Sequence, residues 1–195
     1  MGRIIAVTNQ KGGVGKTTTC INLAASLAAT KRNVLVVDLD PQGNATVGSG
    51  FGKNELEHSS YDLLVGREAL EQVVVNAEGA GYDLVPTNGD LTAAEVELME
   101  ASEREGRLRA VLRPVRERYD FILIDCPPSL NMLTVNALVA ADSVIIPMQC
   151  EYYALEGLTA LLDTIEHIRR AANPGLTVEG LLRTMFDPRN NLAND

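Results

Sequence analysis

Short apolar runs alternate with longer stretches of helical period along this chain. The apolar runs show no polar alternation, which is typical of strands that are covered on both faces of a sheet. A regular alternation of strand and helix indicates right-handed crossovers. We therefore predict an α/β fold, with a doubly wound, mostly parallel sheet and helices on both faces. The predicted strands cover residues 3–8, 33–38, 82–86, 120–125, 143–147 and 178–186.

The predicted helices lie between these strands. Residues 16–30 carry the clearest apolar helical face. Residues 92–119 also have a helical pattern, which Gly106 and Pro114 divide into two or three helices. Residues 40–52 are rich in Gly and Asn, so we predict a loop there. Further helices are predicted over 61–65, 69–76, 131–140 and 152–172.

The strongest chemical signal is a glycine-rich segment that follows the first predicted strand and opens the first predicted helix. In a phosphate-binding loop of this kind, glycines let backbone amides turn inward around a β-phosphate, and the helix N-terminus adds partial positive charge. Lys16 can reach the β- and γ-phosphates, the Thr17 hydroxyl can coordinate Mg²⁺, and Thr18 can meet the α-phosphate. A glycine-rich turn without a ligand is the alternative, which the strand–loop–helix context disfavours. The predicted nucleotide-binding residues of the segment are Lys11, Gly12, Gly13, Val14, Gly15, Lys16, Thr17 and Thr18.

The loop departs from the usual pattern at its start. Gln10 stands where the first glycine is normally found, and Lys11 follows it. Lys11 is placed too early in the loop to cradle its own nucleotide as Lys16 does. A second lysine here is explained if it projects across a subunit interface to a phosphate held by the partner, so that two ATP molecules lie between two chains. A lysine that is merely solvated is the alternative.

Two predicted strands end in aspartate. Asp125 closes an apolar strand and is predicted to hold Mg²⁺ through a water molecule. Asp38 and Asp40 end another strand, and in a parallel sheet these strand ends lie on the same edge as the phosphate loop. Asp40 is the better candidate for orienting the attacking water, and Asp38 for supporting the metal shell. The alternative for either of these two residues is that it caps a turn.

Composition and charge narrow the function classes. The net charge of −9 argues against a protein that coats DNA by bulk charge, although local basic patches could bind phosphate backbones. Six arginines between positions 104 and 118 are interrupted by glutamates, which favours a solvated helix face. Cys20, Cys126 and Cys150 are widely spaced, so we predict buried free thiols rather than a zinc site or disulfides. No apolar run approaches the roughly 20 residues of a membrane span, so we expect a cytoplasmic protein.

The end of the sequence bears on domain organisation. Residues 187–195 leave the last predicted strand, and the sequence then stops. A strand at the edge of a doubly wound sheet normally continues into another helix. We therefore expect that residues 1–195 form a single phosphate-loop ATPase domain that lacks its C-terminal part.

These segments together resemble the ParA/Soj family of DNA-partition ATPases, within the wider group that includes MinD and the nitrogenase iron protein. The resemblance runs over the whole chain and is carried by TNQKGGVGKTTT, VLVVDLDPQGNAT and YDFILIDCPPSLNMLTVNAL, among other segments. It implies a cytoplasmic, nucleoid-associated ATPase that uses ATP and Mg²⁺ and forms a homodimer on binding ATP. The dimer would bind DNA without sequence preference, and a ParB-type partner at a centromere-like site would stimulate hydrolysis and release it.

The resemblance also implies roles for single residues. Lys11 would be the signature lysine of the loop, and Gly12 the glycine whose missing side chain permits close contact in the dimer. Arg189 falls where such proteins carry a DNA-contacting arginine, and adenine would lie near Met185. The implied catalytic residues are Lys11, Lys16 and Asp40, and the implied metal-site residues are Thr17, Asp38 and Asp125, the last being the Walker B aspartate.

Other classes fit the residues less well. A MinD-like membrane-cycling ATPase in division-site placement is the main alternative, but it needs a C-terminal amphipathic helix with basic and bulky apolar faces, which this sequence does not contain. An iron–sulfur redox enzyme needs paired cysteines, and Cys126 and Cys150 do not have the required spacing. A ligase or kinase needs an acceptor site, which no motif marks. We therefore expect no membrane partner.

Overall fold

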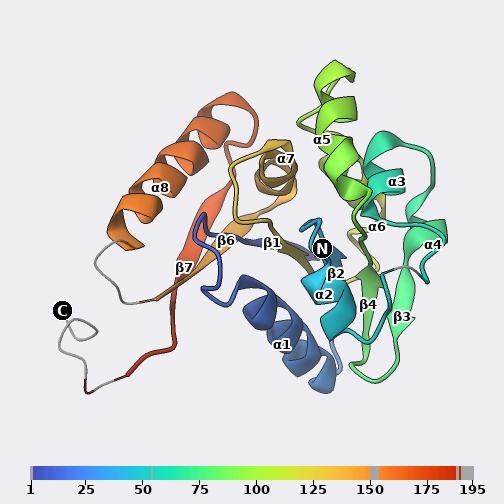
Figure 1. Cartoon of the computed structure of the whole chain (residues 1–195), viewed down its shortest axis with the longest axis horizontal. Coiled ribbons are helices and arrows are strands. Elements are labelled where there is room, and N and C mark those ends of the chain that lie inside the picture. Colours follow the sequence, from blue (N-terminus) through green and yellow to red (C-terminus); the bar gives the residue numbers. More distant parts are fainter. Residues whose placement is uncertain (1, 54, 150–153, 188, 190–195) are drawn as a thin grey trace.

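The computed structural model describes residues 2–53, 55–149, 154–187 and 189. The strands of these residues form a seven-stranded sheet in the order β3-β4-β2-β5-β1-β6-β7 (Figure 1). Neighbouring strands run parallel except for the antiparallel β3–β4 pair. The predicted doubly wound, mostly parallel sheet is therefore confirmed. The strands are β1 (Arg3–Val7), β2 (Val34–Asp38), β3 (Val75–Ala77), β4 (Tyr82–Val85), β5 (Phe121–Asp125), β6 (Ser143–Gln149) and β7 (Thr177–Thr184).

Helices pack against both faces of this sheet (Figure 1). They are α1 (Lys16–Ala29), α2 (Asn44–Gly48), α3 (Ser60–Val65), α4 (Leu70–Val73), α5 (Leu91–Glu100), α6 (Arg107–Val115), α7 (Met132–Ala140) and α8 (Ala154–Ala171). On one face, α1 packs against Ile5 and Val7 of β1. On the other, Ile4 and Ala6 belong to a core shared with α3, α5, α6, α7 and α8. Successive side chains of a strand point to opposite faces of the sheet, and helices cover both faces here. Both sets of positions are therefore apolar, and no polar alternation appears.

Parallel pairing brings three strand ends to one edge of the sheet. Val7 at the end of β1 is in register with Asp125 at the end of β5. Asp125 is also in register with Asp38 at the end of β2. The loop that follows β1 and the aspartates that end β2 and β5 therefore share this edge, as the sequence predicts.

Two predictions of local structure are wrong. Residues 40–52 are not a loop throughout, because Asn44–Gly48 form α2. Residues 69–76 are not one helix, because only Leu70–Val73 are helical and Val75–Ala77 pair with β4. Both elements are shorter than two helical turns, so their own sequence carries too little periodicity to reveal them. They form because other elements supply their contacts, chiefly α1 and β2 for α2 and α3 for α4.

The predicted helical region over 92–119 forms two helices. The break falls at Gly106, which is the N-cap of α6, whereas Pro114 lies inside the last turn of α6 and does not end it. The predicted solvated face is confirmed in part. Four of the six arginines are exposed (Arg104, Arg109, Arg113 and Arg118), whereas Arg107 and Arg116 are half-buried. The predicted helix over 152–172 corresponds to α8, and its first two residues lie outside the described part of the chain.

Two predictions drawn from composition concern thiols and membrane spans. Cys20 and Cys126 are buried free thiols, as predicted, whereas Cys150 lies outside the described residues. Among the described helices, none combines the length and the apolar character that crossing a bilayer requires.

Candidate nucleotide-binding site

The loop between β1 and α1 carries the predicted phosphate-binding residues. Gly13 and Gly15 have left-handed backbone conformations, with φ of 75° and 86°, which residues with a Cβ atom rarely adopt. Gly15 is also the N-cap of α1, so the unpaired amides of the first helical turn face the loop. Gly12 differs from both because its φ does not lie in the left-handed region, and a Cβ atom placed on it would meet nothing within 4 Å. Contacts within one chain therefore do not explain glycine at position 12.

Lys16 lies inside this loop. Its side chain is buried, and its ammonium group donates a hydrogen bond to the carbonyl oxygen of Lys11 at 3.0 Å. Burial lowers the pKa of Lys16, while the charges of Asp125 and Asp40 act in the opposite direction. Thr18, two residues further along, is exposed. The ammonium group thus lies in the loop within the electrostatic influence of the Asp125 and Asp40 carboxylates, which suits a bound phosphate.

Asp125 ends β5 next to this loop. Its side chain is fully buried, and among the described residues neither carboxylate oxygen accepts a hydrogen bond of ordinary geometry. Burial and, after it, the charge of Asp38 raise the pKa of Asp125 to about 8, although the nearby Thr17 side chain acts in the opposite direction. A buried carboxylate without partners is costly, and a cation would supply the missing interaction. Asp125 and the Thr17 hydroxyl therefore fit Mg²⁺.

The number of candidate metal ligands is small. The described residues contain no group of three or more His, Cys, Asp or Glu side chains that could hold a metal ion. Mg²⁺ commonly takes one or two protein carboxylates and completes its octahedral shell with water and phosphate oxygens. A carboxylate and a hydroxyl beside a phosphate loop are a sufficient protein contribution for such an ion.

Asp38 ends the neighbouring strand β2, and its oxygens are already engaged. Oδ2 accepts hydrogen bonds from the backbone N–H and the hydroxyl of Thr46, at 2.8 and 2.7 Å, and Oδ1 accepts one from the N–H of Asp40 at 3.1 Å. Burial raises the pKa of Asp38 to about 6, although these hydrogen bonds oppose the rise. Because Thr46 belongs to α2, Asp38 anchors that helix to the sheet. Its predicted role in the metal shell stays a prediction.

Asp40 forms the turn that leads into α2. Oδ1 accepts a hydrogen bond from the N–H of Gln42 at 2.9 Å, and the Asp40 carbonyl accepts one from Gly43 at 2.7 Å. Oδ2 forms no hydrogen bond with the residues that the structure describes. The predicted water-orienting residue therefore has one carboxylate oxygen that is not used by the turn.

Asn9 is a residue of the site that no motif reveals. It is buried between β1 and the loop, and its amide nitrogen donates a hydrogen bond to the carbonyl of Pro147 at 2.7 Å. Its amide oxygen accepts one from the N–H of Lys11 at 3.0 Å. The side chain thus ties the start of the loop to β6 and fixes the backbone of Lys11, which is half-buried. An asparagine ahead of the glycines has no spacing signal, so only the folded contacts identify it.

The end of β7 also reaches the loop. The Thr184 hydroxyl donates a hydrogen bond to the carbonyl of Val14 at 2.8 Å. Met185, the predicted adenine contact, follows directly and is exposed, with a left-handed φ of 50°. Arg189, the predicted DNA contact, is exposed and forms an ion pair with Asp187 at 2.7 Å. The structure therefore brings Met185 to the edge of the site and leaves Arg189 on the surface.

The raised pKa of Asp125 makes the stability of the nucleotide-free protein depend on pH. Between the ordinary value of 3.8 and the folded value of about 8, the folded state holds a proton that the unfolded state has lost. The free energy of unfolding should therefore fall as pH rises through this range, by about 1.4 kcal/mol per pH unit for this group. Asp125→Asn cannot titrate and should flatten the slope, measured by urea unfolding between pH 5 and pH 8.

Asp163→Asn is the matched control, because Asp163 is exposed on α8. It should leave the slope unchanged. Equal slopes in Asp125→Asn and the parent protein would contradict the pKa assigned to Asp125.

Sequence comparison places the chain among proteins of described function. A family model described as an AAA domain matches residues 2–178. The chain is 54% identical over 194 residues to the chromosome partitioning protein ParA of Myxococcus xanthus, covering 100% of this chain and 69% of that protein. It is 52% identical over 193 residues to the sporulation initiation inhibitor protein Soj of Bacillus subtilis, covering 99% of this chain and 76% of that protein.

Comparison of folds gives a close match to a solved structure with a different description. A protein described as cobyrinic acid a,c-diamide synthase from Mycobacterium smegmatis, with bound ADP and magnesium, superimposes with a TM-score of 0.96 at 41% identity. The match covers 100% of this chain and 79% of that one. The family model covers most of the chain, and both the ParA and the Soj relative are more than half identical to it. On these findings the chain belongs to the ParA/Soj family of chromosome-partitioning phosphate-loop proteins.

Proposed function

We propose that this chain is an ATP-dependent partitioning switch for a chromosome or plasmid. Binding of ATP and Mg²⁺ joins two copies into a sandwich dimer that holds DNA without sequence preference, and hydrolysis stimulated by a ParB-type partner resets the dimer. One observation carries the proposal: the loop places buried Lys16 beside the unpartnered carboxylate of Asp125, with a second lysine, Lys11, at its start. The partition relatives and the ADP- and magnesium-bound structural neighbour support it.

The proposed roles follow from the position of each side chain. Lys16 and the amides of residues 12–17 hold the β- and γ-phosphates, and Thr18 meets the α-phosphate. Thr17 and Asp125 hold the metal, with Asp38 supporting them from β2. When bound, Mg²⁺ neutralises charge that develops on the phosphate oxygens during transfer. Asp40 orients the attacking water through its unused oxygen, and Met185 contacts adenine.

Lys11 acts in the partner's site in this proposal. Lys16 binds the ATP of the same chain, whereas the Lys11 ammonium lies next to the phosphate of the ATP that the second copy holds. The open surroundings of Gly12 fit this arrangement, because a side chain there would project toward the second chain rather than into its own. Dimer formation is then coupled to the nucleotide state, since the partner's phosphate is part of the interface.

The proposed setting is the cytoplasm, with the ATP-bound dimer associated with the nucleoid and Arg189 among its DNA contacts. No membrane partner belongs to this proposal. A MinD-like membrane cycle is the alternative, and it requires binding to lipid vesicles in the ATP state instead of binding to DNA.

Light scattering of the purified protein with ADP, ATP, and ATP plus DNA tests the proposal. We expect a monomer with ADP and a dimer with ATP that shifts to a larger mass on DNA. Lys11→Ala should bind ATP with an affinity within about threefold of the parent and stay monomeric, because in this proposal Lys16 holds the chain's own nucleotide and Lys11 contacts the partner's. Lys31→Ala, at the exposed C-terminal end of α1, is the matched control and should dimerise normally.

Two outcomes would contradict the proposal. A Lys11→Ala protein that dimerises as well as the parent would remove the role of Lys11 at the interface. ATP turnover that depends on a small carboxylate acceptor, with no effect of DNA, would favour a ligase of the kind named for the Mycobacterium smegmatis structure.

A further inference from the structure

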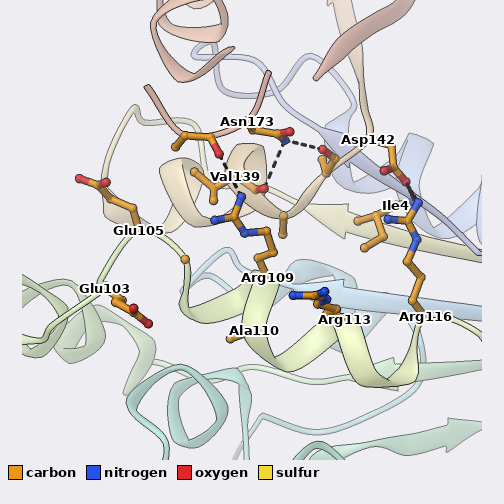
Figure 2. Close-up of a pocket in the computed structure, with 14 residues that line it drawn as sticks. Ile4, Glu103, Glu105, Arg109, Ala110, Arg113, Arg116, Val139, Asp142 and Asn173 are labelled. Carbon is orange, nitrogen blue, oxygen red and sulfur yellow. Dashed lines mark hydrogen bonds and ion pairs between the residues drawn. The ribbon is translucent and has the colours of Figure 1, made fainter. Parts of the chain in front are cut away.

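A second pocket lies at the opposite edge of the sheet from the phosphate loop. Its volume is about 640 Å³, within the range of small-molecule sites. It is lined by Ile4 near the start of β1 and by Asp142 just before β6, so it opens at the amino ends of the strands. Residues of α6 form one wall, and the chain around Asn173, which follows α8, forms the facing wall (Figure 2).

The carbonyl groups on the facing wall already have donors. The Asn173 side-chain amide donates to the carbonyl oxygens of Leu138, Val139 and Ala141, at 2.9, 3.2 and 2.7 Å. Arg109 of α6 reaches across the pocket to the carbonyl of Ala172 at 3.0 Å. The negative ends of α7 and α8 are therefore satisfied without any further cation.

A second arginine of the pocket is also fully engaged. The Arg116 guanidinium contacts the carboxylate of Asp142 at 2.6 Å and donates to the carbonyl of Gly2 at 2.6 Å. The same Asp142 oxygen accepts a hydrogen bond from the N–H of Ile4 at 2.8 Å. This network closes one end of the pocket and leaves the Asp142 carboxylate neutralised.

Arg113 lies between these two arginines and lines the same pocket (Figure 2). Its guanidinium forms no hydrogen bond or ion pair with any residue that the structure describes. It follows Arg109 by four residues and precedes Arg116 by three, and like charges at these helical spacings repel. Glu103 and Glu105 also line the pocket but do not pair with it, and Glu105 lies 3.9 Å from Arg104 instead. Of Arg109, Arg113 and Arg116, Arg113 is therefore the one that has no hydrogen-bonding or ion-pair partner among the described residues.

We propose that this pocket binds a small-molecule oxyanion, a carboxylate or a phosphate, through the guanidinium of Arg113, with Arg109 beside it. A guanidinium presents its N–H groups in a planar fork that matches two oxygens of either anion. The site is separate from the phosphate loop, because the full length of β1 lies between them. The proposal does not rest on ATP binding.

Amide chemical shifts of the isotope-labelled protein test the site. With ADP and Mg²⁺ in excess to occupy the phosphate loop, the protein is titrated with inorganic phosphate and, separately, with citrate. We expect saturable chemical-shift changes in α6 for at least one anion. The anion that binds with the higher affinity shows whether the ligand is a phosphate or a carboxylate. Arg113→Ala should weaken binding at least tenfold, and Arg113→Lys, which keeps the charge without the fork, should weaken it by less.

Arg118→Ala is the matched control, because Arg118 follows α6 but pairs with Glu71 outside the pocket. It should bind as the parent does. Chloride at equal ionic strength should produce no saturable shift in α6. Shifts that are confined to residues 12–17, shifts that chloride reproduces, or shifts that persist unchanged in Arg113→Ala would each overturn the proposal.

Discussion

Lys16→Ala is expected to raise the dissociation constant for ATP·Mg²⁺ at least about 100-fold, which corresponds to about 3 kcal/mol. Lys16 supplies the buried ammonium of the loop, and a charge-assisted hydrogen bond to phosphate contributes roughly 1.5–3 kcal/mol. Its hydrogen bond to the Lys11 carbonyl directs the ammonium into the loop. Isothermal titration calorimetry measures the change.

The buried position of Lys16 calls for a check on folding. Lys16→Met keeps most of the side-chain length without the charge, and both variants are compared with the parent by urea unfolding. Lys31→Ala removes an exposed lysine near the end of the same helix and should bind ATP normally. ATP binding by a folded Lys16→Ala protein within about threefold of the parent would show that the loop does not grip phosphate through this residue.

Asp40→Ala is expected to leave ATP binding and dimerisation in place and to lower the hydrolysis rate by about 10²–10⁴-fold, the usual contribution of a positioned acid–base group. The reason is that Asp40 is assigned to the attacking water and not to the phosphates. The variant should therefore accumulate as the ATP-bound dimer on DNA. Phosphate release under steady-state conditions measures the rate, and light scattering measures the dimer.

Asp40→Asn separates this chemical role from a structural one. Asparagine keeps an acceptor for the Gln42 N–H, which Asp40 Oδ1 now satisfies, but removes the charge. Hydrolysis should be lost in both variants, while Asp163→Ala on the exposed face of α8 should retain it. Normal hydrolysis by Asp40→Asn would mean that Asp40 only shapes the turn before α2.

The strands and the main helices could be predicted because each is long enough to show its own pattern. The strand over 33–38 has an unbroken apolar run, and Val34–Asp38 prove buried on both faces. The five-residue α2 shows no such pattern. It is held by the contact between Thr46 and Asp38, and the Thr46 hydroxyl also accepts a hydrogen bond from the N–H of Thr87 at 2.9 Å. These contacts join residues far apart in the chain, so no local window contains them.

Some residues of the candidate site could also be predicted from the sequence, whereas others could not. The loop and Asp125 could be located because strand, glycines and lysine follow one another at fixed spacing, and because parallel strands end at a common edge. Asp38 and Asp40 were given different roles from the sequence, and the structure places Asp38 at the end of β2 and Asp40 in the turn that follows it. Their difference lies in their partners: three hydrogen bonds reach the carboxylate of Asp38, and only one reaches that of Asp40.

By itself the sequence determined the alternation of strand and helix, the position of the phosphate loop and the chemistry that Lys16, Thr17 and Asp125 can provide. Those properties depend on residue type and on neighbours along the chain. Only the tertiary structure decided which polar groups are left without partners. Within the part of the chain that the structure describes, the buried Asp125 carboxylate has no hydrogen-bond partner. Arg113, at the opposite edge of the sheet, pairs with none of these residues either, because the partners of a charged group are set by residues distant in sequence.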